Sequence, residues 1–261
     1  MNDVVFKYGT LIRTGPKLKY GGKWDSDLVD WVRNEHTNAD LTIYIKIYFQ
    51  KIEPTAAVQT HADSDNNQKK IVAWKPGEFE QFKRTLLGQA QQFWTGRFWL
   101  KTPMGYDDLD YPDDNPKVRC NIYCKLDLSE GTSTDNHYTI AVVRVPDNAN
   151  FRSNSVLYSQ KDLKSEQFTG ATKKFWTHFH EVGHLIGLGH VNEAGLADTN
   201  SDQAYGVTTA QLNDVMGKGS DRHEKHAAPW QEAAEAFTGI AKGQWTVFMH
   251  YIRPQPIPPT S

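Results

Sequence analysis

The sequence predicts an α+β fold, and three observations lead to this prediction. Several runs alternate apolar and polar residues, as half-buried strands do. Other segments carry apolar residues three and four positions apart, which is typical of amphipathic helices. Strand-like runs also follow one another with no helix between them. The 261 residues suffice for one large domain or two small subdomains around a shared cleft.

Strands are expected in five places. Residues 41–52 place leucine, isoleucine and phenylalanine on one face and more polar residues opposite. Residues 118–128 alternate in the same way, and residues 137–146 and 155–160 are β-prone runs bounded by turn residues. Residues 245–252 form the last strand-like run.

Helices are expected between these strands. Residues 76–95 carry an apolar stripe that should pack on the sheet, and residues 171–186 carry a second one. Residues 229–240 begin with Pro229 and end near Gly239, which suit the first turn and the end of a helix.

The first 40 residues fit this pattern less well. Residues 9–24 look like a glycine-punctuated hairpin, and residues 25–36 predict a short helix capped by aspartate or serine. We therefore expect an N-terminal extension over 1–40, as a pro-segment or an extra hairpin, then a catalytic domain over 41–252. The proline-rich tail 253–261 should be extended.

Charge and hydropathy exclude several classes of partner. With 29 Lys and Arg against 31 Asp and Glu, the net charge of −2 gives no basic surface for nucleic acid or an anionic membrane. No apolar stretch approaches the roughly 20 residues of a membrane span. The N-terminus lacks the apolar region of a secretory signal, so we expect a soluble chain, exported or delivered by another route.

The decisive motif is HEVGHLIGLGH, residues 180–190. Histidines four apart on a helix lie one turn apart on the same face, so His180 and His184 can reach one metal ion. His190 can reach the same ion only if the chain turns back, and Gly187 has the permissive backbone for this turn. Glu181 then lies where a carboxylate can act as general base.

Three neutral imidazoles and an open fourth position favour one catalytic Zn²⁺, although copper, nickel or cobalt would also fit. A pair of histidines four apart also occurs on helix surfaces that bind no metal. A third histidine, a glutamate and a glycine at fixed offsets make that reading a poor explanation.

These residues resemble the metzincin zinc metallopeptidases, whose HExxHxxGxxH signature is matched in full. The resemblance implies an upper subdomain, with a mixed twisted sheet, a backing helix and an active-site helix. It also implies a lower irregular subdomain with a methionine turn and a C-terminal helix. Residues 213–217, NDVMG, are similar to that turn, so Met216 is expected beneath the three imidazoles. The alternative is an ordinary core methionine.

Two positions depart from the metzincin pattern. Some members have a catalytic tyrosine two residues after the methionine, but Lys218 stands there, so that role cannot be transferred. Val191 follows the third histidine and places the chain in no named family. The chain looks like a divergent member, such as a bacterial toxin or effector peptidase. In metzincins the substrate pairs with an edge strand, for which 137–146 is the candidate; a covered interior strand is the alternative.

Several smaller features have both functional and structural interpretations. His178, His223 and His226 are interpreted as surface or capping residues, although the last two could border the cleft. Cys120 and Cys124 are too far apart on one strand for a disulfide and are expected to be buried thiols. One of them, or Asp25, Asp27 or Asp30, could instead cover the metal in a latent form. The acidic residues Asp107, Asp108, Asp110, Asp113 and Asp114 could bind Ca²⁺, but proline favours a solvated loop.

The sequence thus predicts a monomeric zinc metalloendopeptidase that hydrolyses protein or peptide substrates. A zinc peptidase acting on the stem peptides of bacterial cell wall is one alternative. A binding module whose zinc only stabilises the fold is another. Glu181 argues against it, because structural zinc sites usually have four protein ligands and need no base.

Overall fold

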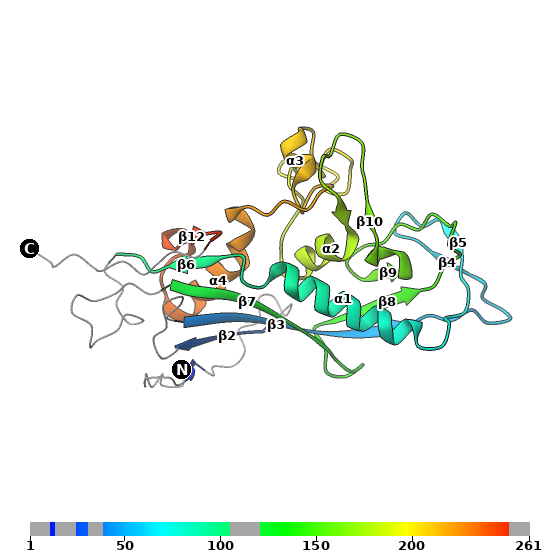
Figure 1. The fold of residues 1–261 in the computed structure, drawn as a ribbon, viewed down its shortest axis with the longest axis horizontal. Helices are drawn as coiled ribbons and strands as arrows, with labels where there is room; N and C mark the ends of the chain where they lie inside the picture. Colours follow the sequence, from blue (N-terminus) through cyan, green and yellow to red (C-terminus); the bar gives the residue numbers. More distant parts are fainter. Residues whose placement is uncertain (1–10, 14–24, 31–38, 105–120, 251–261) are drawn as a thin grey trace, which may run out of the picture. The chain divides into compact units, whose positions relative to one another are not determined.

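The structure is a computed structural model that describes residues 11–13, 25–30, 39–104 and 121–250. In this part of the chain a mixed β-sheet, two small two-stranded sheets and a few helices form a mixed α/β architecture, as the sequence predicts (Figure 1). No helix among these residues is long and apolar enough to span a membrane.

The chain divides into two compact units, and strand β3 contributes residues to both. Unit 1 comprises residues 1–44, 94–127 and 223–261, and unit 2 comprises residues 45–93 and 128–222.

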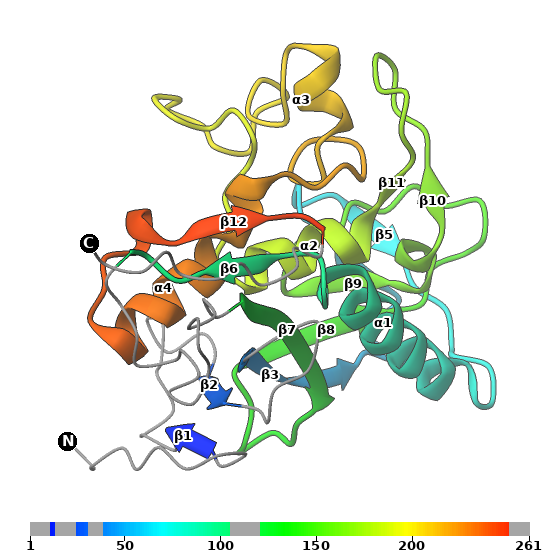
Figure 2. The ribbon, with the colours of Figure 1, turned by 60° about the vertical axis from the view of Figure 1, so that its left-hand side comes forward.

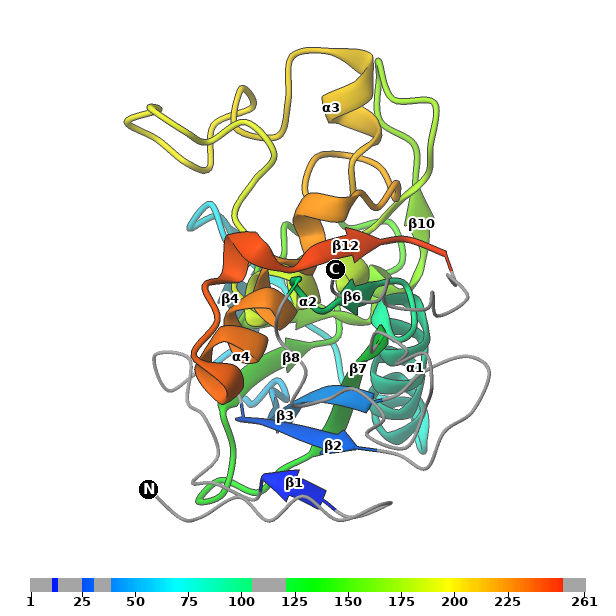
Figure 3. The ribbon, with the colours of Figure 1, turned by 90° about the vertical axis from the view of Figure 1, so that its left-hand side faces the viewer.

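The strands of unit 1 follow the order β1-β2-β3-β7-β6-β12. Strand β2 pairs antiparallel with β1 and β3. Strand β6 pairs antiparallel with β7 and with β12, and Figure 3 shows β12 beside β6. The strands are β1 (Leu11–Arg13), β2 (Asp25–Asp30), β3 (Ala39–Lys51), β6 (Trp99–Lys101), β7 (Asn121–Glu130) and β12 (Thr246–Phe248).

The helix expected over residues 25–36 is wrong in its first half, because residues 25–30 form β2. They pair residue by residue with the start of β3, from Asp25 opposite Tyr44 to Asp30 opposite Ala39. The DSDLVD segment has neither the length nor the repeated apolar spacing of a stable helix, so backbone pairing with a long strand determines its conformation.

Helix α4 (Ala228–Thr238) belongs to unit 1 and confirms the predicted helix over 229–240 to within two residues at each end. Proline occupies its first turn, and Gly239 ends it with a φ of 75°. The buried Trp230 ring packs against Phe98 at 5.6 Å, and its indole N–H donates to the carbonyl of Lys125 at 2.8 Å. Two short 3₁₀ helices flank α4: η2 (Glu224–Ala227) and η3 (Lys242–Gln244).

In unit 2 the last residues of β3 pair in parallel with β8 (Tyr138–Val143), which pairs in parallel with β9 (Leu157–Ser159). The predicted strand at 137–146 is confirmed, but its proposed place at the sheet edge is wrong. Strand β3 pairs with residues 138–142 of β8 and β9 pairs with residues 141–143, so a substrate strand cannot pair along the whole of β8.

Helix α1 (Glu78–Trp94) confirms the predicted helix over 76–95 and lies beside the sheet (Figures 1 and 2). Its apolar stripe is buried, and ion pairs at its start and middle join it to neighbouring strands. Glu78 accepts a bond from Arg144 Nε at 2.7 Å, and Lys83 Nζ lies 2.9 Å from Glu80 and 2.5 Å from Glu130. A hairpin of β4 (Thr60–Ala62) and β5 (Gln68–Lys70) precedes α1.

Helix α2 (Thr177–Leu185) carries the histidine motif, but it begins six residues later than predicted. The residues before it form β11 (Phe175–Trp176), which pairs antiparallel with β10 (Ser165–Glu166). The 3₁₀ helix η1 (Gln160–Leu163) precedes this hairpin, and α3 (Thr209–Asn213) follows α2. The hairpin and α3 extend on the same side of α2 (Figure 2), where Asn213 Oδ1 accepts bonds from the backbone N–H groups of residues 172 and 173.

Several sequence predictions fall on residues outside the described part of the chain. They are the acidic loop at 107–114, Cys120, the proline-rich tail 253–261 and most of the predicted N-terminal hairpin. Cys124 is described, and it is a buried free thiol, as predicted.

Candidate metal centre

Two of the three motif histidines lie on one face of α2, one turn apart. Val182 and Leu185 are buried on another face and hold the helix in place. His180 is fully buried, and its Nδ1–H donates to the carbonyl of Val215 at 2.7 Å. His184 is half-buried, and its Nδ1–H donates to the carbonyl of Leu188 at 2.8 Å.

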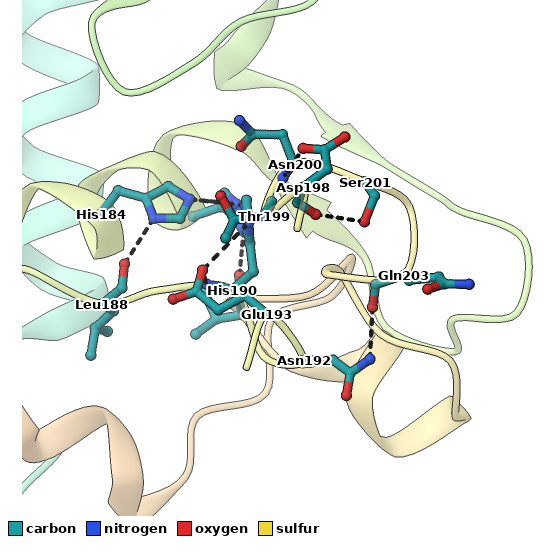
Figure 4. Close-up of polar contacts among 12 residues, drawn as sticks. His184, Leu188, His190, Asn192, Glu193, Asp198, Thr199, Asn200, Ser201 and Gln203 are labelled. Carbon is teal, nitrogen blue, oxygen red and sulfur yellow. Dashed lines mark hydrogen bonds and ion pairs between the residues drawn. The ribbon is translucent and has the colours of Figure 1, made fainter. Parts of the chain in front are cut away.

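The third histidine arrives through the chain reversal that the sequence predicts at Gly187. This glycine has a φ of 103°, a conformation that L-residues with a side chain rarely adopt. Beyond it, the N–H of Leu188 bonds back to the carbonyl of Gly183, and the chain continues to His190. The Nδ1–H of His190 donates to the carbonyl of Thr199 at 2.6 Å, and its backbone N–H donates to Glu193 Oε2 at 2.8 Å (Figure 4).

These three bonds determine the tautomer of every ring. A carbonyl oxygen can only accept, so Nδ1 carries the proton in each neutral imidazole and Nε2 carries a lone pair. The three Nε2 atoms point toward one another: that of His184 lies 3.1 Å from that of His180 and 3.2 Å from that of His190. Three acceptors converge without a proton between them, which is the arrangement that a bound metal ion requires of its imidazole ligands.

The spacing of the three nitrogens fits a zinc ion. Zinc–nitrogen bonds of about 2.0–2.1 Å in a tetrahedron place neighbouring ligand atoms roughly 3.3–3.4 Å apart. The observed Nε2 separations of 3.1 and 3.2 Å approach this value, and all three ligand atoms lie within 4.8 Å of one another. The three histidines therefore lie close enough to bind a single metal ion.

Burial keeps the rings in the neutral form that binds metal. It lowers the pKa of His184 to about 4 and lowers the pKa of His190. Burial also lowers the pKa of His180 well below its ordinary value, and the two neighbouring imidazoles add to this shift. At neutral pH no proton competes with the metal for the three lone pairs.

Glu181 follows the first ligand on α2, and its side chain is buried. Burial raises the pKa of this carboxyl to about 8, and the nearby negative charge of Asp162 adds to the shift. A dication bound by the adjacent histidines would favour the carboxylate form. A pKa of about 8 places Glu181 in the range of groups that can exchange protons near neutral pH.

Met216 lies in a tight turn whose backbone contacts two of the histidine-bearing segments. The carbonyl before it, that of Val215, orients His180, and its own carbonyl accepts a bond from the N–H of Val191 at 3.0 Å. The carboxylate of Asp214 accepts the N–H of Met216 at 2.8 Å and closes the turn. The methionine side chain is buried. Sequence reasoning identified the residue but not these main-chain contacts.

The sequence analysis missed Tyr205, which packs directly on the histidine rings. Its ring centroid lies 4.0 Å from that of His190 and 5.5 Å from that of His180, to which it is nearly parallel. The only signal for it in the sequence is an isolated aromatic residue in a stretch otherwise rich in glycine, aspartate and asparagine. Tyr205 forms one wall of the candidate site.

The other histidines that the sequence singled out do not join this cluster. His178 was interpreted as a surface residue, but it is fully buried, with Nδ1–H donating to the carbonyl of Asp162 at 2.9 Å. It points away from the ligand face because it lies two residues before His180. His223 is exposed, and its backbone N–H donates to Nδ1 of the buried His226.

Comparison of the chain with protein-family models, curated proteins and solved structures found no match in any of the three.

Proposed function

We propose that this chain is a zinc-dependent endopeptidase of the metzincin kind, acting on protein or peptide substrates. The observation that carries the proposal is the convergence of three Nε2 lone pairs beside a buried glutamate on the same helix. A purely structural zinc site usually has a fourth protein ligand, and no fourth histidine, cysteine or carboxylate joins the cluster in the described part of the chain.

Three further features support the metzincin comparison. The ligand helix ends just before a glycine with positive φ, the third histidine follows the reversal, and a buried methionine lies in a turn bonded to both segments. Within unit 2 we infer an upper half with β8, β9 and α1, and a lower irregular half formed by residues 187–222. In this proposal Met216 packs beneath the imidazoles.

Bound zinc would supply a Lewis acid that polarises the scissile carbonyl and makes water more acidic. Glu181 accepts a proton from the water that attacks the carbonyl carbon. As the carbon–nitrogen bond breaks, Glu181 delivers this proton to the leaving amine. The carbonyls of Val215, Leu188 and Thr199 hold the three rings in a fixed orientation during these steps.

The decisive experiment compares the same substitution at two glutamates of the site. Glu181→Gln keeps the side-chain shape, so the zinc-loaded variant should fold and bind metal normally. It should cleave about 10²–10⁴-fold more slowly, because that factor is typical of general-base catalysis. The matched control is Glu193→Gln, whose amide oxygen can still accept the N–H of His190. It should keep activity within a few-fold of wild type.

Zinc content is measured by elemental analysis, and cleavage is followed with casein and with purified bacterial sacculi. Cleavage of sacculi alone would transfer the proposal to cell-wall stem peptides. If zinc-loaded wild type cleaves neither substrate nor an unbiased peptide library, the chain is a binding module and the proposal is wrong. If Glu181→Gln retains full activity, another group is the base.

A further inference from the structure

A positively charged side chain lies near Tyr205, the ring that packs on the histidines. Lys218 Nζ lies 5.7 Å from the centroid of the Tyr205 ring and 5.7 Å from that of Phe168. Because the Tyr205 and His190 rings are 4.0 Å apart, the ammonium lies at most about 10 Å from the His190 ring. The backbone N–H of Lys218 donates to the carbonyl of Leu212 at 3.0 Å, which fixes where the side chain starts.

The ammonium pairs with a carboxylate that is largely exposed to solvent. Lys218 Nζ lies 3.0 Å from Asp202 Oδ1, and the side chain of Asp202 is 88% exposed whereas that of Lys218 is 22% exposed. An ion pair with one such exposed member contributes little, about 0–1 kcal/mol. Another carboxylate can therefore replace Asp202 at small cost.

The electrostatic surroundings of Asp202 favour a carboxylate at this place. The hydrogen bond from Lys218 lowers the pKa of Asp202, and the positive charge of Arg152 lowers it further. Arg152 itself pairs with Asp65 at 3.0 Å, and both side chains are well exposed. Besides Asp202, two other negative groups raise the pKa of Tyr205: the buried Glu181 and the exposed Asp65. Two ion pairs, Lys218–Asp202 and Arg152–Asp65, thus lie close enough to Tyr205 to act on it or to contact its ring.

We propose that Lys218 determines substrate specificity: its ammonium binds the carboxylate of an acidic substrate residue, and Asp202 holds that place until the substrate arrives. This proposal rests on the proposed peptidase function and names its preferred substrates. They are peptides with glutamate or aspartate close to the cut bond.

The distances indicate how close that residue lies. An extended peptide advances about 3.3 Å per residue, so roughly 10 Å corresponds to about three residues. A glutamate within three residues of the cut bond can therefore reach Lys218 while the peptide bond lies at the histidines. Two aromatic rings near the ammonium, and a Lys218 side chain that is only 22% exposed, reduce its contact with water and strengthen the bond to a carboxylate.

The test measures binding, so that it does not depend on cleavage. Zinc-loaded Glu181→Gln protein is titrated with two sets of acetylated, amidated decapeptides that share one sequence. A single glutamate moves through the positions in one set, and a glutamine moves through them in the other. At one position or two neighbouring positions, the glutamate peptide should bind about three- to tenfold more tightly than its glutamine twin.

Substitutions at the ion pair should change this preference in opposite directions. Adding Lys218→Met keeps an unbranched side chain of similar length without the charge and should abolish the preference, and Lys218→Arg should retain it. Adding Asp202→Asn removes the competing carboxylate, so glutamate peptides should bind several-fold more tightly, with no change for glutamine peptides. Lys173→Met is the control, because it removes the same charge from a lysine that contacts Asp221 instead.

Equal binding of every glutamate and glutamine pair, or no binding of either, would overturn the proposal. An Asp202→Asn variant that binds both sets of peptides more weakly would also overturn the proposal. In that case the ion pair would only stabilise the loop that contains Thr199, whose carbonyl orients His190. The peptidase proposal fails separately, when zinc-loaded wild type cleaves none of the peptides that it binds.

Discussion

Helix α2 and the irregular segment that follows it, residues 187–222, both build the candidate metal centre, but they do so in different ways. The helix contributes side chains: two ligands and the glutamate, all placed by helical periodicity. The irregular segment contributes one ligand and, mainly, backbone carbonyls. Those of Leu188, Thr199 and Val215 each hold one histidine ring.

This difference separates two requirements of a metal site. The helix determines which side chains meet, and the irregular segment determines which nitrogen of each ring is available. The segment can do so because its main chain is closely packed on itself. A Cβ at Gly217 would lie 2.1 Å from the carbonyl oxygen of Gln211 and 2.7 Å from that of Tyr205.

The largest effect should come from removing a ligand that the helix supplies. His184→Ala takes away the central nitrogen of the three, the one within 3.2 Å of both others. We expect zinc content to fall from one ion per chain to near zero, with loss of activity, because two imidazoles make an incomplete site. Elemental analysis after dialysis measures this. The exposed His223→Ala should keep a full zinc complement, and equal loss in both variants would contradict the assignment.

A second prediction concerns the buried acid beneath α2. Asp162 accepts bonds from the Ser153 hydroxyl at 2.6 Å and the Ser159 N–H at 2.5 Å, yet burial raises its pKa from 3.8 to about 7. The folded chain therefore keeps this proton between about pH 4 and 7, where the unfolded chain releases it. Since the folded state binds more protons, the free energy of unfolding contributed by Asp162 falls as pH rises through this window.

Asp162→Asn removes this titration. The unfolding free energy of wild type relative to the variant should fall by roughly 3–5 kcal/mol from pH 4 to pH 7, at about 1.4 kcal/mol per unit. Urea denaturation of both proteins at equal metal content measures the difference. A difference that rises with pH would mean that the hydrogen bonds outweigh burial and that Asp162 is ionised in the fold.

What the sequence could predict follows the same division between regular and irregular structure. Long periodic segments were identified correctly, including α1, β3 and α4, because their spacing alone reports which face is buried. The residues of the short strands β2 and β11 were assigned to helices, because their pairing partners lie elsewhere in the chain. Local propensity does not record such pairing.

The same limit applies to the candidate site. The histidine motif and Gly187 could be placed from spacing, since they lie within eleven residues on a helix and its reversal. Tyr205 and the carbonyl of Thr199 could not, because they reach the rings through a segment without periodicity. A carbonyl contact also leaves no trace in residue type, as every residue has one.

A third prediction tests whether the irregular segment depends on close packing of its main chain. Gly217→Ala forces a methyl group against two carbonyl oxygens that cannot move independently, so we expect a loss of about 2–3 kcal/mol in unfolding free energy. Weaker zinc binding should accompany it, since Val215 and Met216 belong to the same turn. Denaturation and zinc titration measure the two effects.

The matched control for this variant is Gly88→Ala in α1, where nothing lies within 4 Å of the added methyl group. Alanine there should stabilise the chain by about 0.5–1 kcal/mol, because glycine is unfavourable inside a helix. Equal effects of the two substitutions would show that the turn is not closely packed.

The smallest effect should come from Met216→Leu. The contacts of Met216 on either side are made by its backbone, which donates to Asp214 and accepts from Val191, and both survive the substitution. The buried side chain changes shape but scarcely changes volume, so the cost should stay below about 1.5 kcal/mol. Zinc stoichiometry and most of the activity should be retained. Met216→Ala leaves a cavity and should cost about 2–5 kcal/mol. If the leucine variant lost zinc while remaining folded, the thioether sulfur rather than the packing would matter, and the segment would act on the metal centre through a side chain as the helix does.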